Sequence, residues 1–237
     1  MNTNTIVKAT AKIGGESLYI NFINGDETVL GGIAGINQNV FKIDDIDIKE
    51  NDIILDIGSN VGIISLYLAK KYPQSILHAF DPCKEAIDCL RTSLIDNKLY
   101  NIITHNFAVG ASNSFLEFSF EKDHFSCLQE NKFDNPQTQE RRIYKKMPQV
   151  KIDEIFDSYI FNISRVKYLK IDIEGSEVEV FEHLIENRID ILDRIDYINL
   201  EFHHHPQIEG TTNRILKIKE FLVQKFENRV IFQDAFL

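Results

Sequence analysis

The sequence predicts an α/β protein with a doubly wound, mostly parallel sheet of seven-stranded type and helices on both faces. Short apolar runs alternate with helical patterns from Asp52 to Leu200, an order typical of a parallel sheet covered by helices. The run Ile53–Ile57 is too apolar to have a face in solvent, so we expect it at the centre of the sheet. Several runs end in glycines or polar residues, at the edge where such sheets bind ligands.

The elements follow one another at ordinary lengths. Helices are indicated by apolar residues three and four apart, and we expect them over residues 61–71, 84–97, 151–159, 176–187 and 213–226. Strands are expected over residues 53–57, 75–80, 102–108, 115–120, 166–173, 195–202 and 229–232. Residues 51–237 should therefore form one domain.

Two stretches lie outside this repeating pattern. Residues 1–50 contain short, glycine-rich strand patterns and are predicted to form a β-rich N-terminal appendage. Residues 121–149 are polar and irregular. A connection of that length is usually functional or disordered, so we expect a loop on the substrate side of the domain.

Composition limits the classes of function. The 237 residues are 43% hydrophobic, enough for a sizeable core, and carry a formal net charge of −10. That charge argues against a protein that binds nucleic acid, which needs a basic face. Three cysteines without metal-like spacing suit a reducing compartment. With no signal-peptide pattern and no apolar run of membrane-spanning length, we expect a cytoplasmic protein, and a homodimer is compatible with it.

The strongest ligand signal follows the strand at 53–57. Gly58 and Gly62 permit a tight turn and a close approach of the backbone to a ligand. Asp81 ends the next strand, where it can accept hydrogen bonds from ribose hydroxyls. The alternative interpretation is a pair of glycines that only pack a helix, beside a solvated Asp81.

The spacing of the glycines distinguishes between nucleotide cofactors. A dinucleotide site needs Gly-x-Gly-x-x-Gly around a pyrophosphate, whereas here Gly58 and Gly62 are four apart and Asp56 precedes them. An acid would repel a pyrophosphate but suits the ammonium and sulfonium charges of S-adenosylmethionine. The amide and ring that end the third strand could hold adenine. The predicted cofactor residues are Asp56, Gly58, Ser59, Asn60, Gly62, Asp81, Pro82, Asn106, Phe107 and Ala108.

At this point the motifs resemble a known family. Asp56 to Gly62, Ala79 to Pro82, Asn106 to Gly110, and Lys170-Ile-Asp-Ile-Glu-Gly-Ser-Glu177 are similar to the FkbM family of S-adenosylmethionine-dependent methyltransferases, and Glu201-Phe-His203 also matches. The family usually has Glu where this chain has Asp81. The resemblance implies a Rossmann-like methyltransferase fold and O-methylation, frequently on sugars or polyketide-type hydroxyls, with S-adenosylhomocysteine as the product.

Candidate catalytic residues cluster after the fourth and fifth strands. Asp172 and Glu201 end these strands, and Lys170 alternates with Asp172 onto the same face. His203 is the preferred general base. The alternative is a divalent cation held by Asp172, Glu201 and His203, which would lower the pKa of a bound hydroxyl. Glu177, in the first turn of a helix, is interpreted as complementing the helix dipole.

Substrate contacts are predicted from charge and position. The candidates are Glu174, His204, Arg141 and Arg142. The two arginines could bind a diphosphate bidentately, as a nucleotide-linked sugar would require, although a basic cluster is more often a solvated loop.

The preferred function is therefore O-methylation of a sugar, nucleotide-linked or part of a surface polysaccharide pathway. A composition rich in Ile, Lys and Asn suggests a bacterial source. Three other interpretations stay open. They are an N-methyltransferase for an amine or protein side chain, a nicotinamide-dependent oxidoreductase, and a scaffold without catalytic activity.

Overall fold

The central sheet of the computed structural model has six strands, in the order β12-β11-β10-β3-β4-β5, and every pairing in it is parallel. The strands are β3 (Ile53–Ile57), β4 (Ile76–Phe80), β5 (Ile102–His105), β10 (Val166–Ile171), β11 (Ile195–His204) and β12 (Val230–Phe236). The structure describes residues 5–24, 26, 28–121, 127–129, 142–158, 163–204 and 210–236. The predicted doubly wound sheet is confirmed, with six described strands where the sequence indicated a seven-stranded type.

The strand order reverses beside β3, which determines where a ligand can bind. β4 and β5 continue the sheet on one side of β3, whereas β10, β11 and β12 continue it on the other. In such sheets the ligand crevice lies beyond the carboxyl ends of the strands, at the point of reversal. The segments that follow Ile57 and Ile171 are in direct contact there, because the Asp172 amide donates to the Ile57 carbonyl at 3.0 Å.

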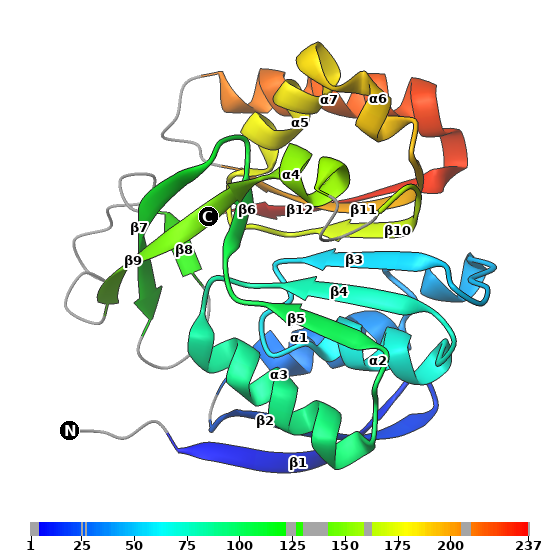
Figure 1. Cartoon of the computed structure of the whole chain (residues 1–237), viewed down its shortest axis with the longest axis vertical. Helices are drawn as coiled ribbons and strands as arrows, with labels where there is room; N and C mark the ends of the chain where they lie inside the picture. The colour runs from blue at the N-terminus through cyan, green and yellow to red at the C-terminus, as the bar shows by residue number, and fades with distance from the viewer. Residues whose placement is uncertain are drawn as a thin grey trace.

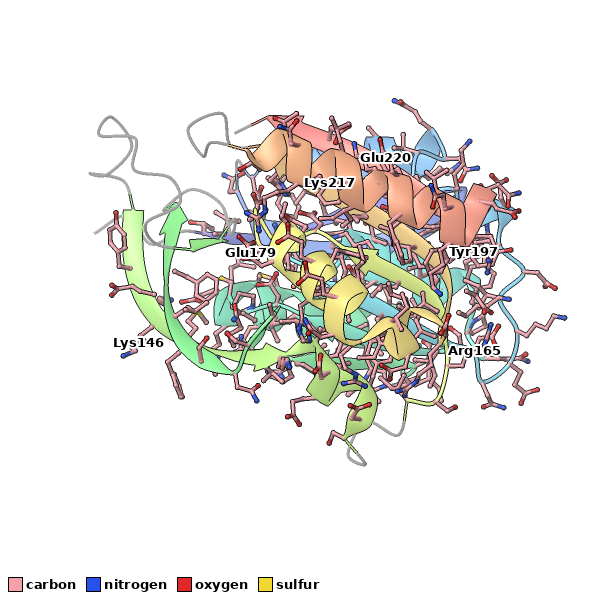
Figure 2. All side chains as sticks on the ribbon, turned by 90° about the horizontal axis from the view of Figure 1, so that it is seen from above. Lys146, Arg165, Glu179, Tyr197, Lys217 and Glu220 are labelled. Carbon is pink, nitrogen blue, oxygen red and sulfur yellow. The ribbon has the colours of Figure 1, made fainter. Side chains whose placement is uncertain are left out.

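Helices cover both faces of the sheet (Figure 1). One face carries α2 (Ile63–Lys71) and α3 (Lys84–Asn97), and the other carries α5 (Glu177–Asn187), α6 (Ile189–Leu192) and α7 (Thr211–Phe226). Each layer has its own hydrophobic cluster against the sheet. Polar side chains such as Glu179, Lys217 and Glu220 cover the outer surface of α5 and α7 (Figure 2). None of the described helices is long and apolar enough to cross a bilayer.

A second sheet, ordered β6-β9-β7-β8, stands beside the first. It contains β6 (Ala108–Gly110), β7 (Ser114–Glu121), β8 (Cys127–Gln129) and β9 (Arg142–Lys151). The strand expected over residues 102–108 is thus divided, because the chain leaves the central sheet after β5. Part of the loop expected over 121–149 is strand. In β9 the buried Met147 lies between exposed neighbours such as Lys146 (Figure 2), and the charged residues conceal this alternation in the sequence.

The N-terminal segment forms a hairpin of β1 (Ile6–Ile13) and β2 (Glu16–Ile23), then α1 (Thr28–Asn37) and a short 3-10 turn, η1 (Ile43–Asp45). The sequence did not indicate α1, because glycine is a poor helix former and α1 contains three glycines. The hairpin lies against α2 and α3 (Figure 1). Its buried Leu18 and Ile20 belong to the same hydrophobic cluster as those helices, so we expect the segment to unfold together with them.

Ser93 provides a test of this docking. Its buried hydroxyl accepts a hydrogen bond from the Asn21 amide of β2 at 2.9 Å and donates one to the Cys89 carbonyl. Ser93→Ala should lower the free energy of unfolding by about 1–3 kcal/mol, because the Asn21 N–H is left buried without an acceptor. Urea denaturation measures the change. Thr92→Ala, an exposed change on the same helix turn, should cost less than about 0.5 kcal/mol, and equal costs would contradict the docking.

Candidate active site

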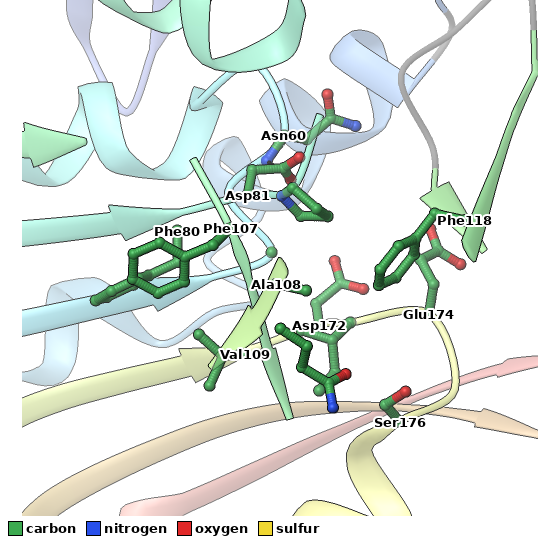
Figure 3. A pocket seen from close by; sticks show the side chains of 14 residues that line it. Asn60, Phe80, Asp81, Phe107, Ala108, Val109, Phe118, Asp172, Glu174 and Ser176 are labelled. Carbon is green, nitrogen blue, oxygen red and sulfur yellow. Dashed lines mark hydrogen bonds between the residues drawn. The ribbon is translucent and has the colours of Figure 1, made fainter. Parts of the chain in front are cut away.

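Two adjoining cavities open at the edge of the sheet where β3 and β10 end. The first is lined by Gly58, Asn60, Phe80, Asp81, Pro82, Phe107, Ala108, Val109, Phe118, Gln149, Asp172, Ile173, Glu174 and Ser176 (Figure 3). The second, with a volume of about 460 Å³, is lined by α1, the loop from Gly58 to Gly62, and Ile63, Ile64, Val40, Phe41, Lys170, Asp172, Glu174, Glu201, His203 and Gln233. Gly58, Asn60, Asp172 and Glu174 belong to both linings and mark the junction.

The loop at the junction requires glycine at its first position. Gly58 has φ +81°, and a Cβ built there would lie 1.6 Å from the Asp172 carbonyl oxygen. The amides of Gly58 and Ser59 both donate to the Phe80 carbonyl at the end of β4, at 2.9 and 3.0 Å. The loop is therefore fixed between the ends of β10 and β4.

Lys170, a buried residue of β10, connects this loop to the central sheet. Its ammonium donates to the Gly58 carbonyl at 2.7 Å and lies 3.2 Å from Asp172 and 3.5 Å from Asp56. Burial alone would lower the pKa of Lys170, but the carboxylates of Asp172 and Asp56 raise it above its ordinary value. The lysine is therefore charged, and its ammonium is held by Gly58, Asp172 and Asp56. We interpret it as a positioning residue.

Asp56 lies beneath the loop and lines neither cavity. It is fully buried, and one carboxylate oxygen accepts from the Ser65 hydroxyl at 2.6 Å. Its expected influence on a ligand thus passes through Lys170 and the Gly58 carbonyl. The negative charge also offsets the cost of burying the lysine.

Asp81 is held at the floor of the first cavity. Its two carboxylate oxygens accept from the amides of Asn60 and Cys83, at 2.9 and 2.8 Å. Burial raises the pKa of Asp81 to about 7, although these hydrogen bonds oppose the shift. Each oxygen keeps a second lone pair, so the ionised group can accept further hydrogen bonds from a ligand.

Asn106 and Phe107 differ in their relation to the cavity. The Asn106 amide donates to the carbonyls of Asp81 and Pro82, at 3.0 and 2.9 Å, and does not line the cavity. It fixes the turn that carries Asp81. Phe107 lines the cavity and lies 5.6 Å, centroid to centroid, from Phe80 (Figure 3). Ala108 lies beside it, so this end of the cavity suits a flat apolar group.

An acid–histidine cluster forms the wall between the two cavities. Nε2 of His203 lies 3.3 Å from a carboxylate oxygen of Glu174 and 3.7 Å from one of Asp172. Nδ1 of His203 is hydrogen-bonded to Glu177 at 3.0 Å. Figure 3 shows Asp172 and Glu174 across the first cavity from Asn60 and Asp81.

The protonation of this cluster bears on the expected general base. Burial alone would lower the pKa of His203, but the hydrogen bond to Glu177 and the charges of Glu174 and Asp172 raise it to about 10. Burial and the charge of Asp172 raise the pKa of Glu174 to about 7 and also raise that of Glu201. At neutral pH His203 therefore carries a proton on each ring nitrogen and has no lone pair for a substrate proton.

Glu177 has a larger role than its sequence position indicated. It is fully buried, and it accepts from the amides of Ile173 and Gly175 as well as from His203. It thus fixes both the β10–α5 turn and the imidazole, beyond complementing the helix dipole. In the sequence, the role of Glu177 could have been indicated only by the two acids, Glu174 and Glu177, on either side of Gly175. The sequence also gave no sign that α1, Phe118 or Gln149 would line the cavities.

Some predicted substrate residues are not described in atomic detail. Arg141 lies outside the described residues, and of Arg142 and His204 the structure describes the backbone, at the start of β9 and the end of β11. Their contacts with a substrate stay predictions.

Comparison with known proteins identifies the family. The profile of the "Methyltransferase FkbM domain" matches residues 56–229, which is most of the chain. Two curated relatives are "Methyltransferase 1" of Beauveria bassiana (strain ARSEF 2860), 23% identical over 158 residues, and "Methyltransferase sdnD" of Sordaria araneosa, 23% identical over 177 residues. The matches span 62% and 63% of this chain and 64% and 66% of the relatives. The chain thus matches slightly less than two thirds of their length.

Solved structures are similar only at a low level. Trm5b from Pyrococcus abyssi is 14% identical, with a TM-score of 0.42 over 93% of this chain and 48% of that one. An rRNA methylase from Streptococcus thermophilus is 12% identical, with a TM-score of 0.41 over 78% and 77%. Similarity at this level carries no information about the substrate.

Gly58→Ala tests the junction between the two loops. The new methyl group would meet a backbone oxygen that cannot move away, so the substitution should lower the free energy of unfolding by about 3 kcal/mol or more. Gly15→Ala is the matched control, since Gly15 has φ +87° with no atom within 4 Å of the added carbon, and it should cost about 1 kcal/mol. Urea denaturation of both variants gives the comparison, and similar costs would mean that the two loops are not in close contact.

Proposed function

The chain belongs to the FkbM methyltransferase family, and on this premise we propose that it transfers a methyl group from S-adenosylmethionine to a hydroxyl of a sugar. The observation that carries the proposal is the pair of cavities that meet at Gly58 and Asp172. One has the groups that a nucleoside needs. The other has acidic groups that suit a hydroxyl acceptor.

The first cavity is assigned to the adenosine part of the cofactor. Asp81 accepts hydrogen bonds from the ribose hydroxyls through its remaining lone pairs, and the adenine ring lies beside Phe107 and Ala108. The methionine part extends past Gly58 into the second cavity, along the backbone of the loop that ends at Gly62. The sulfonium then lies near the junction, close to the carboxylate of Asp172, whose charge complements it.

The acceptor is assigned to the acidic end of the second cavity. The hydroxyl oxygen attacks the methyl carbon while the S–C bond breaks, and the electron pair of that bond returns to sulfur to give S-adenosylhomocysteine. Glu201 lines only the acceptor cavity and takes the hydroxyl proton as general base, because His203 is already protonated. The main contribution of the protein is the alignment of oxygen, carbon and sulfur.

A sugar is preferred over an apolar acceptor because of the groups around the reaction centre. Asp172, Glu174, Glu201 and Gln233 offer several hydrogen-bond acceptors within one cavity. A polyhydroxylated molecule can donate to their remaining lone pairs, whereas an apolar acceptor would displace water from these groups without replacing its hydrogen bonds. Attachment of the sugar to a nucleotide, and a role in a bacterial polysaccharide pathway, extend this proposal and depend on Arg141 and Arg142.

Cofactor binding tests the first part of the proposal. S-adenosylhomocysteine should bind in calorimetric titration and NADH should not. Because the ionised Asp81 accepts ribose hydrogen bonds and its pKa is about 7, affinity should rise about 3- to 10-fold from pH 6 to pH 8. Asp81→Asn should weaken binding at least about 10-fold and remove this pH dependence.

Asp88→Asn is the control, since Asp88 carries the same charge on the surface of the adjoining helix. It should leave affinity and its pH profile unchanged. No binding of S-adenosylhomocysteine at millimolar concentration would refute the cofactor assignment, and binding of NADH in its place would favour the oxidoreductase.

Turnover tests the acceptor. With labelled methyl donor, a screen of nucleotide-linked and free sugars should yield a methylated product. Glu201→Gln should lower kcat at least about 100-fold with unchanged affinity for S-adenosylhomocysteine. Product found only on amines, with Glu201→Gln fully active, would favour the N-methyltransferase, because a neutral amine needs no base.

A further inference from the structure

We propose that Asp172, Glu174 and His203 bind one divalent cation of the Mg²⁺ or Mn²⁺ class in the wall of the acceptor cavity. The binding itself is independent of the proposed function, whereas its use in catalysis rests on that function. The sequence pointed to Asp172, Glu201 and His203, but the folded chain brings Glu174 into the group in place of Glu201.

The spacing of the three side chains fits a shared ion. Each offers one ligand atom, and these atoms all lie within 4.8 Å of one another. Ligands bound to one cation at about 2.1 Å and at right angles are about 3 Å apart. Nε2 of His203 is already 3.3 Å from Glu174 and 3.7 Å from Asp172. Small side-chain rotations would therefore complete the coordination.

His203 is oriented as a ligand. Only 5% of the side chain is exposed, and its Nε2 faces the carboxylates of Glu174 and Asp172. The distances from Nε2 to these carboxylates are longer than the 2.7–2.9 Å of a charge-assisted hydrogen bond. A metal ion can therefore take their place at Nε2. Nδ1 is held by Glu177, which is itself fixed by the amides of Ile173 and Gly175. A buried carboxylate behind the far ring nitrogen is the usual support of a metal-bound histidine.

The backbone beside the cluster is also held in a special conformation. Glu174 has φ +56°, in the left-handed region that residues with a side chain seldom adopt. This conformation costs about 1 kcal/mol. A carboxylate oxygen of Glu174 lies within 4.8 Å of one of Asp172, in spite of the repulsion between the two charges. A cation between them would turn that repulsion into attraction.

The balance of charge favours a cation as well. Four carboxylates, those of Asp172, Glu174, Glu177 and Glu201, act on this part of the cavity. The nearby cations are Lys170, which is shared with the buried Asp56, and His203. Binding of a divalent ion through Nε2 displaces the proton of that nitrogen to solvent, so the ion adds one net positive charge to this acidic group.

Such an ion would narrow the class of acceptor. Three protein ligands on one side leave further coordination positions open toward the cavity. Two neighbouring oxygens of a diol or a hydroxyketone could occupy them, and the ion would lower the pKa of the bound hydroxyl. The hydroxyl proton passes to Glu201, and the oxidation state of the ion does not change. A chelating acceptor of this kind agrees with a sugar.

Electron paramagnetic resonance of Mn²⁺ tests the site without turnover. The 237-residue chain is freed of metal with EDTA, exchanged into chelator-free buffer and titrated with MnCl₂ at pH 7.5. We expect one site per chain with a Kd below about 100 µM, and displacement of Mn²⁺ by Mg²⁺. Less than one tenth of a site occupied at 1 mM MnCl₂ would overturn the proposal.

Variants locate the bound ion. His203→Gln and Asp172→Asn should each weaken Mn²⁺ binding at least 10-fold, and Glu177→Gln should weaken it about 10-fold because it loosens the imidazole. Glu186→Gln, which removes an exposed charge at the end of α5, should leave Kd within twofold. Equal binding by His203→Gln and the parent would place the ion elsewhere and refute the site.

S-adenosylhomocysteine affinity is measured on the same samples. A variant that retains it is folded, so its loss of Mn²⁺ can be attributed to the site. If Mn²⁺ binds as expected and S-adenosylhomocysteine does not, the cation site stands and the proposed function fails. If the reverse holds, the methyl-donor assignment stands and the cation proposal fails.

Discussion

The edge of the sheet where the two cavities meet depends on one buried ammonium group, that of Lys170. The Lys170 ammonium donates to the Gly58 carbonyl and is balanced by Asp56 and Asp172. It thereby joins β3 to β10 at the point where the strand order reverses. Removal of this charge would leave the buried carboxylate of Asp56 uncompensated beneath the loop and that of Asp172 without its partner, an arrangement that costs several kcal/mol. The position of Gly58, and with it the junction of the two cavities, follows from this interaction.

The close contact at the junction explains the unusual backbone conformation of the residues that follow β10. Because the Asp172 carbonyl lies where a Cβ of Gly58 would be, the chain after β10 must turn away at once. It does so through Glu174, with positive φ, and Gly175. Glu177 then accepts from the turn amides and from His203. One buried glutamate therefore links the turn to the imidazole, which places the acidic cluster at the junction of the two cavities.

Prediction from sequence succeeded where local pattern and burial agree. The apolar run at 53–57 and the amphipathic helix at 84–97 coincide with β3 and α3. It failed where pairing partners are distant. Nothing near β9 indicates that it pairs with β7, and α1 contains too many glycines to be recognised as a helix. Asn106 illustrates the same limit, since its type suited a ligand whereas its amide closes the turn at Asp81 and Pro82.

The family, the parallel sheet and the strand ends that carry the chemistry can be recognised from the sequence, because glycine spacing and apolar periodicity are local properties. Tertiary structure decided what those side chains do. Asp56 is covered by the loop, His203 is held by Glu177, and Glu174 rather than Glu201 joins Asp172. These roles arise from contacts between residues distant in the sequence, such as His203 and Glu177, 26 positions apart, and Lys170 and Gly58, 112 positions apart. They also arise from the removal of water around these groups, which shifts their pKa values. Neither the long-range contacts nor the removal of water can be recognised in a short stretch of the sequence.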